Sequence, residues 1–390
     1  MAGWNDLPTE FKVLVVEMVD DKGFVQEDLT ILVPDSFRAL LALSSMDREL
    51  HALVSPLLWK TIALFYAPIA RYHQFASKSK AGAEGRFVQN LSLYVPITPT
   101  TGFPSVVEAY TELLATTSHL KTFRLRCYTT SVVSGILPHL PSTLSSTLQK
   151  LTLEGDIKKG AVEAVVVAAL IYALPHLVVV ELSGFYHQDE GAPLAIKALR
   201  SLRHLQQLII EDGGGLVHTS LADAWSSSLD SLQLDDVNGA ELLEIPRLRI
   251  LLKRHSNTLQ ELVVPWYLDR NTFPHFSLPK LERLTLWVDD TSAFLPLSFS
   301  ASPLRTLTLK MLGEFGEVKE MADVAAIAVL QHRGTLKEVS VMVMANDFAG
   351  QEDQDAMESL KELCRKDSVH FESLTARGWT KNIENLGVVE

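Results

Sequence analysis

The fold of this chain is decided by four stretches, LKTFRLR (120–126), LQKLTLEG (148–155), LVVVELSG (177–184) and LQQLIIED (205–212), which share one apolar pattern. A large apolar residue is followed after two intervening residues by a second, and after one more by a third. The pattern occurs eleven times, at Val88-Leu91-Leu93, Leu120-Phe123-Leu125, Leu148-Leu151-Leu153, Leu177-Val180-Leu182, Leu205-Leu208-Ile210, Leu229-Leu232-Leu234, Leu259-Leu262-Val264, Leu281-Leu284-Leu286, Leu304-Leu307-Leu309, Leu336-Val339-Val341 and, more loosely, Phe371-Leu374-Ala376. Such regularity indicates one structural unit that is repeated along the chain.

The spacing of the pattern predicts an α/β solenoid. From Val88 to Phe371 the mean period is about 28 residues, which is typical of leucine-rich repeats. The second and third apolar residues of each copy are two positions apart, so on a strand they face the same side. We expect parallel strands on the inner face of an arc, right-handed crossovers, and helices or loops outside. Where two copies lie only 22 or 23 residues apart, after Leu259 and Leu281, we expect turns in place of a full helix.

The repeat is degenerate. Leucine-rich repeats often carry Asn at the ninth position, where its side chain satisfies backbone groups of the loop. In the first six copies this position holds Pro96, Tyr128, Asp156, Phe185, Gly213 and Val237. The loops of this solenoid must therefore be satisfied in another way.

The first 66 residues have a helical pattern in place of the repeat. Three helices are expected, with these apolar residues on their buried faces: Leu7, Phe11, Leu14, Val15 and Met18; Phe37, Leu40 and Leu41; Leu50, Leu53, Val54 and Leu57. The second helix is expected to begin after Asp35 or Ser36, which are good caps, and Trp59 closes the third. This unit has more apolar surface than it can bury, which predicts that it caps the solenoid or binds a partner.

The sequence thus predicts four segments. Residues 1–66 form the helical unit, and 67–86 form a polar connector that contains KSKAGAEG. Residues 87–379 form the solenoid of about eleven repeats, and 380–390 form a tail.

Composition excludes several classes of partner. The net charge of −12 argues against a nucleic-acid surface, which needs clustered Lys and Arg. The longest apolar run, 164–174, is shorter than the roughly 20 residues of a membrane helix, and the N-terminus has no signal-peptide pattern. The two cysteines, Cys127 and Cys364, form no metal-binding array, which favours a reducing compartment. We expect a cytoplasmic or nuclear protein that binds neither nucleic acid nor membrane and needs no metal or other cofactor.

Three short motifs of the helical unit resemble an F-box. They are LPTE (7–10), MDREL (46–50) and SPLLWKTI (55–62), the last of them especially close to fungal members. An F-box followed by degenerate repeats is similar to the F-box/leucine-rich-repeat proteins over nearly the whole chain. Two features differ from that family: residues 21–35 lengthen the first connection between helices, and Leu50 replaces an aromatic residue.

This resemblance implies a non-catalytic role in ubiquitin transfer. In that family the F-box binds the Skp-family adaptor of an SCF-type cullin–RING ubiquitin ligase, and the repeats hold the protein substrate. The adaptor-binding residues that it implies are Leu7, Pro8, Leu40, Met46, Leu50 and Trp59. One alternative is a leucine-rich-repeat scaffold whose N-terminal helices are only a cap. An enzyme, the third alternative, would need a deep pocket with converging titratable groups.

The strand residues that face away from the apolar side predict a charged binding wall. It is acidic at its centre and basic toward both ends, where Arg126, Arg283 and Lys310 lie. The candidate substrate-binding residues are Arg124, Glu154, Glu181, Glu211, Asp235, Glu261 and Trp287. We hypothesise that the acids capture a basic segment of a partner and that Trp287 anchors it. The alternatives are that an acidic protein simply solvates its strands with acids, and that Trp287 packs against a neighbouring loop.

Catalytic motifs are absent from the sequence. It has no G-x-S-x-G elbow, phosphate-binding loop, dinucleotide fingerprint or H-E-x-x-H. Histidines that precede the apolar pattern, His119, His176, His204 and His370, lie about one repeat or more apart. We therefore expect them to be structural residues of the repeat turns and expect no enzymatic activity.

Overall fold

The structure is a computed structural model. It describes residues 9, 12, 35–46, 48–64, 73–78, 84–95, 103–127, 135–140, 144, 146–155, 163–184, 191–211, 219–235, 245–265, 276–288, 299–311, 318–343 and 351–375. For some residues at the ends of these segments, the description covers the backbone only. The chain divides into two compact units, Met1–Glu154 and Gly155–Glu390, and each is described by itself.

Twelve described strands are all parallel to their neighbours, and their order in the sheet is their order in the sequence. Unit 1 contains β1 (Thr61–Leu64), β2 (Asn90–Val95), β3 (Thr122–Cys127) and β4 (Lys150–Glu154). Unit 2 contains β5 (Val179–Ser183), β6 (Gln207–Glu211), β7 (Ser231–Asp235), β8 (Glu261–Pro265), β9 (Arg283–Val288), β10 (Thr306–Met311), β11 (Glu338–Val343) and β12 (His370–Thr375). Strands β2 to β11 coincide with the first ten copies of the apolar pattern, so the predicted parallel repeat is confirmed. The eleventh copy is out of register, because Phe371 on β12 lies opposite Val339, the second apolar residue of the tenth copy, and Ser373 lies opposite Val341.

The register of the strands aligns equivalent apolar residues of successive repeats. Leu208 on β6 pairs with Val180 on one side and Leu232 on the other, and all three are fully buried. Each such leucine contributes about 2–3 kcal/mol through the apolar area that it removes from water. Because these contacts recur from strand to strand, the apolar core continues along the sheet.

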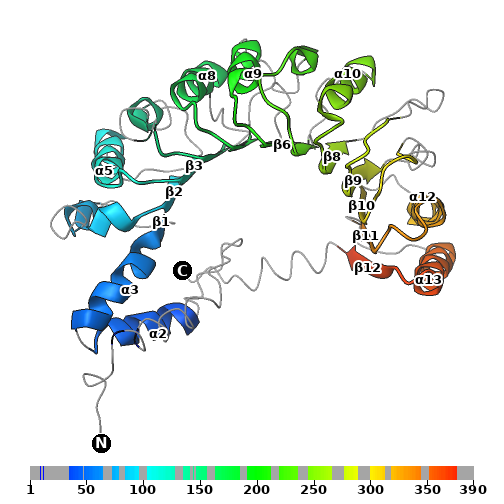
Figure 1. The fold of residues 1–390 in the computed structure, drawn as a ribbon, viewed down its shortest axis with the longest axis horizontal. Helices are drawn as coiled ribbons and strands as arrows, with labels where there is room; N and C mark the ends of the chain where they lie inside the picture. Colours follow the sequence, from blue (N-terminus) through cyan, green and yellow to red (C-terminus); the bar gives the residue numbers. More distant parts are fainter. Residues whose placement is uncertain are drawn as a thin grey trace, which may run out of the picture. The chain divides into compact units, whose positions relative to one another are not determined.

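Return helices cover one side of the strands in unit 2 (Figure 1). They are α8 (Ala164–Ala173), α9 (Ala192–Ser201), α10 (Ile245–His255), α12 (Val318–Gln331) and α13 (Gln351–Lys366). A short 3₁₀ helix, η5 (Thr219–Ala222), takes the place of a longer one before β7. Each helix buries its strand-facing residues, as Met321, Val324 and Val329 do in α12.

Two short intervals are closed without a helix, as the sequence predicts. The described residues there, 276–282 and 299–305, form turns and contain no helix. Phe276 and Phe299 are buried and stack with ring centroids 5.3 Å apart. Two aromatic rings therefore fill the volume that a helix fills elsewhere.

Backbone hydrogen bonds satisfy the strand ends that lack the Asn of a regular repeat. The Gly155 N–H donates to the Ser183 carbonyl at 2.8 Å, and the Gly184 N–H donates to the Glu211 carbonyl at 3.2 Å. Gly184 has a φ of +76°. A Cβ at this position would lie 2.5 Å from the Gly155 carbonyl oxygen, so the two backbones approach closely because neither residue has a side chain.

Unit 1 begins with helices and continues with strands. The predicted second and third helices are present as α2 (Asp35–Ser44) and α3 (Arg48–Lys60), and Thr9 and Lys12 are also helical. Their described core consists of Leu40, Leu43, Leu50 and Val54, with Leu53, Leu57 and Leu58 packed against it. Further elements of unit 1 are η2 (Glu84–Phe87), α5 (Phe103–Thr116) and η3 (Leu137–His139).

Strand β1 corrects the prediction that residues 1–66 are helical to their end. Thr61–Leu64 leave α3 directly as a strand that pairs with β2, with Ile62 opposite Leu91. The Asn90 side-chain amide donates to the Thr61 hydroxyl at 3.0 Å. The β-branched residues Thr61 and Ile62 suit a strand, and their pairing covers an edge of β2 that would otherwise be open.

The predicted connector, 67–86, also contains structure. Residues 73–78 are helical, Ala76 is fully buried, and the Phe75 ring lies 5.0 Å from that of Trp59. This part of the chain therefore packs within unit 1. The predicted loop at 21–35 lies outside the described residues except for Asp35, which begins α2, and so does the tail at 380–390.

Candidate functional site

Unit 1 exposes two large apolar residues at the end of α2. Leu41 is 46 % exposed and Met46, in the turn before α3, is 44 % exposed. The hydroxyls of Ser44 and Ser45 donate to the carbonyls of Leu41 and Ala42, which ends α2 cleanly at this turn. We call Leu41 and Met46 the helical docking surface, because exposed apolar residues of this size mark contact sites when they gather.

The structure separates the predicted adaptor-binding residues into different environments. Met46 is exposed, whereas Leu40 and Leu50 are fully buried between α2 and α3. Trp59 is half-buried against Phe75. Leu7 and Pro8 lie outside the described residues.

Burial keeps Leu40 and Leu50 from direct contact with an adaptor in this conformation. The separate prediction that Leu41 lies on the buried face of the second helix is wrong, because Leu41 faces solvent. The reason is the helical repeat: Leu40 and Leu43 share the face that meets α3, and Leu41 points about 100° away from Leu40. Leu40 and Leu50 can contribute to docking only by holding the two helices together.

Glu49 links the N-terminal helical residues to α3. The Lys12 ammonium, which is buried, lies 2.6 Å from a Glu49 carboxylate oxygen. The Thr9 hydroxyl donates to the same carboxylate. The Glu of MDREL thus holds Thr9 and Lys12 against the start of α3, a role that its place in the motif did not reveal.

On the strands of unit 1, the predicted binding residues satisfy one another. Arg124 on β3 donates to Glu154 on β4 at 2.5 Å, and the Arg126 guanidinium lies 3.6 Å from the same carboxylate. The register places Arg126 directly opposite Glu154. The sequence indicated charges of both signs on this wall but not that they form one cluster.

We expect Glu154→Gln to lower the free energy of unfolding by about 1–2 kcal/mol, because two partly buried arginines lose their shared carboxylate. The matched control is Glu282→Gln, since Glu282 pairs with Arg305 at 3.7 Å where both side chains are more exposed. That change should cost less than about 0.5 kcal/mol. Urea titration followed by circular dichroism measures both. Equal effects would show that the Glu154 cluster has no special stability.

In unit 2 the predicted acidic residues lie in different rows of the sheet. Glu211 on β6 is opposite Asp235 on β7, whereas Glu181 on β5 is opposite Ile209. Glu261 on β8 accepts from the Ser231 hydroxyl at 3.1 Å and lies 3.3 Å from the Arg283 guanidinium. The side chains of Asp235 and Trp287 lie outside the description.

The wall of unit 2 is therefore less uniformly acidic than its sequence indicates. The row that begins at Glu181 continues through Ile209, Gln233, Val263 and Thr285, which carry no charge. Glu211 is exposed and Glu181 is half-exposed, so both can meet a partner. Capture of a basic segment by these acids remains a prediction.

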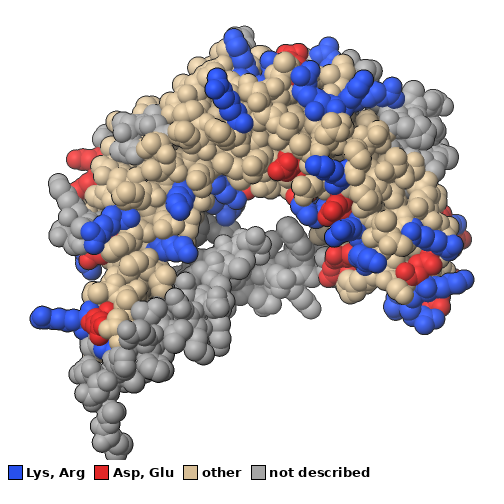
Figure 2. Space-filling view, viewed as in Figure 1, with Lys and Arg blue, Asp and Glu red and all other residues tan. Residues whose placement is uncertain are grey.

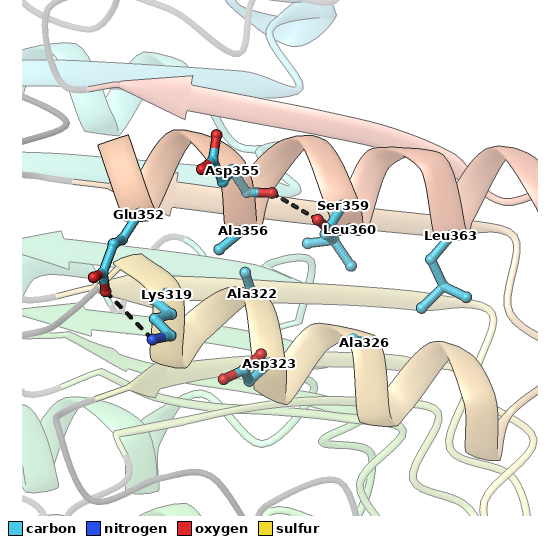
Figure 3. Close-up of a pocket in the computed structure, with 10 residues that line it drawn as sticks. All are labelled: Lys319, Ala322, Asp323, Ala326, Glu352, Asp355, Ala356, Ser359, Leu360 and Leu363. Atoms are coloured by element: carbon cyan, nitrogen blue, oxygen red, sulfur yellow. Dashed lines mark hydrogen bonds and ion pairs between the residues drawn. The ribbon is translucent and has the colours of Figure 1, made fainter. Parts of the chain in front are cut away.

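A groove of about 470 Å³ lies between α12 and α13 (Figure 3). Its floor includes Ala322, Ala326 and Ala356, whose small side chains leave the space open. Lys319 closes one end through an ion pair with Glu352 at 3.4 Å. The remaining charged rim is acidic like the chain as a whole, so it points to no particular chemistry.

Two buried histidines were missed by the sequence analysis. His255 ends α10, accepts the Leu229 N–H at 3.1 Å, and meets the Trp225 ring edge-on at 5.4 Å. Burial, aided by the neighbouring Arg254, lowers the pKa of His255 from 6.5 to about 4. A signal was present: His255 and His332 both lie four residues before the first leucine of a repeat.

His332 occupies the equivalent place in its own repeat. It is buried, and burial lowers the pKa of its imidazole, against a smaller opposing effect from a backbone hydrogen bond with Ser302. Within the described residues, the Nε2 atoms of His255 and His332 have no hydrogen-bond partner. Both are neutral core residues that brace the ends of their helices.

Metal and thiol chemistry find little support in the described part of the chain. No group of three or more His, Cys, Asp or Glu residues there is placed to hold a metal ion. Cys364 is buried, and burial raises the pKa of its thiol to about 11, which keeps it protonated and unreactive.

Among the helices that the structure describes, none combines the length and the apolar character needed to cross a membrane. The comparisons with known proteins were also negative: the sequence matches no family model and no curated protein. The structural features that bear on function are therefore the parallel repeat and the helical docking surface.

Proposed function

We propose that this protein is the substrate-recognition subunit of an SCF-type cullin–RING ubiquitin ligase. Its N-terminal helices would bind a Skp-family adaptor, and its repeats would bind a protein target. The observation that carries this proposal is the α2–α3 pair, which has its own core and yet leaves Leu41 and Met46 exposed. The resemblance of LPTE, MDREL and SPLLWKTI to an F-box supports the same assignment.

The helical docking surface suits an apolar partner groove. Leu41 and Met46 are held by a helix and a tight turn, so little conformational entropy is lost when they become buried. The flexible thioether chain of Met46 can adapt to the shape of the groove. Glu49, tied to Lys12, would bring the LPTE residues to the same partner.

The repeats would contribute recognition without chemistry. Parallel strands present a row of side chains at fixed spacing, which suits an extended or folded protein surface. Glu211, opposite Asp235 in the register, is the part of unit 2 best suited to a basic target segment. Other subunits would form and transfer the ubiquitin thioester, while this chain holds the target within reach.

Adaptor retention tests the proposal. Tagged full-length protein should retain a Skp-family adaptor, and Leu41→Glu with Met46→Glu should weaken retention about tenfold or more, because two charges enter an apolar contact. The matched control is Ile250→Glu with Leu330→Glu, which changes two equally exposed apolar residues of unit 2. Retention by the control should equal wild type, and melting temperatures show whether both variants are folded.

Failure of the wild-type chain to retain the adaptor would overturn the ligase proposal. The second candidate, a repeat scaffold whose helices are a cap, is favoured by one observation: α3 runs directly into β1, which covers the edge of β2. If the helices are only a cap, deletion of residues 1–64 would unfold the first repeats of unit 1 and would not change adaptor retention.

A further inference from the structure

The outer side of α8 is apolar, which is unusual for a return helix. Val165 and Tyr172 are each 50 % exposed, and Ala169 lies between them at i+4. The opposite side, including Val167 and Ile171, is buried on the strands. The helix sequence AVVVAALIYA has no polar face for solvent, so its exposed stripe is not explained by folding alone.

The neighbouring helix extends this apolar stripe. α9 packs along α8, and its Leu194 is 49 % exposed in the first turn of α9, as Val165 is in the first turn of α8. We call Val165, Ala169, Tyr172 and Leu194 the outer α8–α9 face. Val165, Tyr172 and Leu194 are among the most exposed large apolar residues of the described part of the chain. They lie on two adjacent helices, whereas exposed apolar residues without a function are usually scattered singly.

A cationic pocket lies at the other end of the same face. It has a volume of about 290 Å³ and is lined by Tyr172 and His176 from one repeat and by Ser201, Arg203 and His204 from the next. The two imidazole rings stack with centroids 6.3 Å apart and planes inclined by 20°. His176 and His204 are both exposed, so the repeat places two equivalent turn histidines side by side.

The chemistry of this pocket suits a carboxylate. Arg203 carries a permanent positive charge, and the Tyr172 hydroxyl, the Ser201 hydroxyl and the two imidazoles supply further donors. None of the described residues that line the pocket is acidic. The whole chain has a net charge of −12, so a pocket that contains Arg203 and no acidic residue is unusual in it.

Basic residues also gather beyond the pocket. Figure 2 shows Lys and Arg side chains over α9 and α10, where Lys197, Arg249, Lys253 and Arg254 are exposed. They would attract a negatively charged partner over a longer range than the pocket itself. Attraction and apolar contact thus act on the same side of unit 2.

We propose that the outer α8–α9 face binds an acidic amphipathic helix of a partner protein. Its apolar side chains would pack on Val165, Tyr172 and Leu194, and one of its carboxylates would enter the pocket beside Arg203. The stripe from Val165 to Tyr172 spans about 10 Å, which matches two turns of a helix with apolar residues at i, i+4 and i+7.

A helix is favoured over a membrane surface by the form of the site. The apolar residues are Val, Ala, Leu and Tyr along two helices, without the Trp or Phe that commonly anchors proteins in a lipid interface. A small pocket with several directional donors also suits a single carboxylate better than a layer of headgroups. This proposal does not rest on the ligase function.

The test uses the full-length chain and two designed peptides of about 16 residues, long enough to form a helix. Both carry Leu at i, i+4 and i+7; one has Glu at each end, and the other has Lys at the same positions. Fluorescence anisotropy at 0.15 M salt, where the Debye length is about 8 Å, limits contributions from distant charges. The Glu peptide should bind with a Kd of about 1–100 μM and the Lys peptide at least about tenfold more weakly.

Variants locate the site. Arg203→Glu and Tyr172→Ser should each weaken the Glu peptide about tenfold, and Arg203→Glu should bind the Lys peptide better than wild type does. The matched control is Lys280→Glu, an equal charge change at an exposed residue of the turn before β9, which should alter the Kd less than about twofold. Hydrogen exchange should show peptide-dependent protection of residues 165–173 and 194–204.

Three results would overturn the proposal: equal affinity for the two peptides, no binding below about 1 mM, or binding to anionic vesicles but not to the Glu peptide. The variant with Leu41→Glu and Met46→Glu should bind the peptide as wild type does, because its changes lie in unit 1. Loss of adaptor retention and loss of peptide binding are therefore separable outcomes.

Discussion

Gly184→Ala is expected to lower the free energy of unfolding by about 2–5 kcal/mol, through backbone strain and a steric clash that add together. The residue has a φ of +76°, which an L side chain rarely adopts. The new Cβ would also lie 2.5 Å from the Gly155 carbonyl oxygen and 2.6 Å from its carbonyl carbon. Because these are backbone atoms held by the Gly155–Ser183 hydrogen bond, they cannot move aside cheaply.

The matched control for this change is Gly334→Ala. Gly334 has a similar φ of +86°, but a Cβ there would meet nothing within 4 Å. It should therefore cost only the strain of the left-handed conformation, about 1–2 kcal/mol. Urea unfolding of both variants, followed by circular dichroism, gives the difference. If the two variants were equally stable, close approach of the Gly155 and Gly184 backbones would not be a feature of this fold.

Acidification from pH 6.5 to 4 is expected to remove about 3 kcal/mol of stability through His255 alone. Burial lowers the pKa of this imidazole from 6.5 to about 4 in the folded chain. Above pH 6.5 the imidazole is neutral in both states, and its full contribution is present. As the pH falls, the unfolded chain binds the proton first, so stability decreases until the folded imidazole also titrates near pH 4.

His255→Gln isolates this effect. Its side-chain oxygen can still accept the Leu229 N–H, but the residue no longer titrates. The variant should therefore lose less stability than wild type between pH 6.5 and 4, by about 3 kcal/mol. If the stability of wild type and of His255→Gln fell equally between pH 6.5 and 4, His255 would not be a buried neutral imidazole. His332 is present in both proteins, so its own effect does not alter the difference between them.

The sequence was sufficient to predict the repeat. Aliphatic residues such as Leu208 and Leu232 recur with a period that stacked parallel strands can bury, and strands β2 to β11 follow that period. The two short intervals also left too few residues for a helix, and the stacked Phe276 and Phe299 fill them. Local patterns succeed here because each repeat contacts mainly its neighbours.

Prediction was weaker wherever contacts between repeats decide the outcome. The first strand, Thr61–Leu64, was not predicted, because it lies outside the repeated apolar pattern and is recognised by its pairing with β2. The charges of Arg124 and Glu154 were visible, but their ion pair depends on the register of β3 and β4. The sequence analysis placed Leu41 with Leu40 on the buried side of the second helix, but Leu41 lies on the surface and Leu43 is the buried neighbour of Leu40.

The sequence by itself determined that this protein is a parallel repeat with a helical N-terminus, because apolar periodicity dictates which side of each element must leave water. Only the tertiary structure decided which surfaces remain for partners. It buried Leu50, exposed Leu41 and Met46, and brought His176 beside His204 across two repeats. Burial and proximity are properties of packed elements, and residues one repeat apart become neighbours only when the strands between them align.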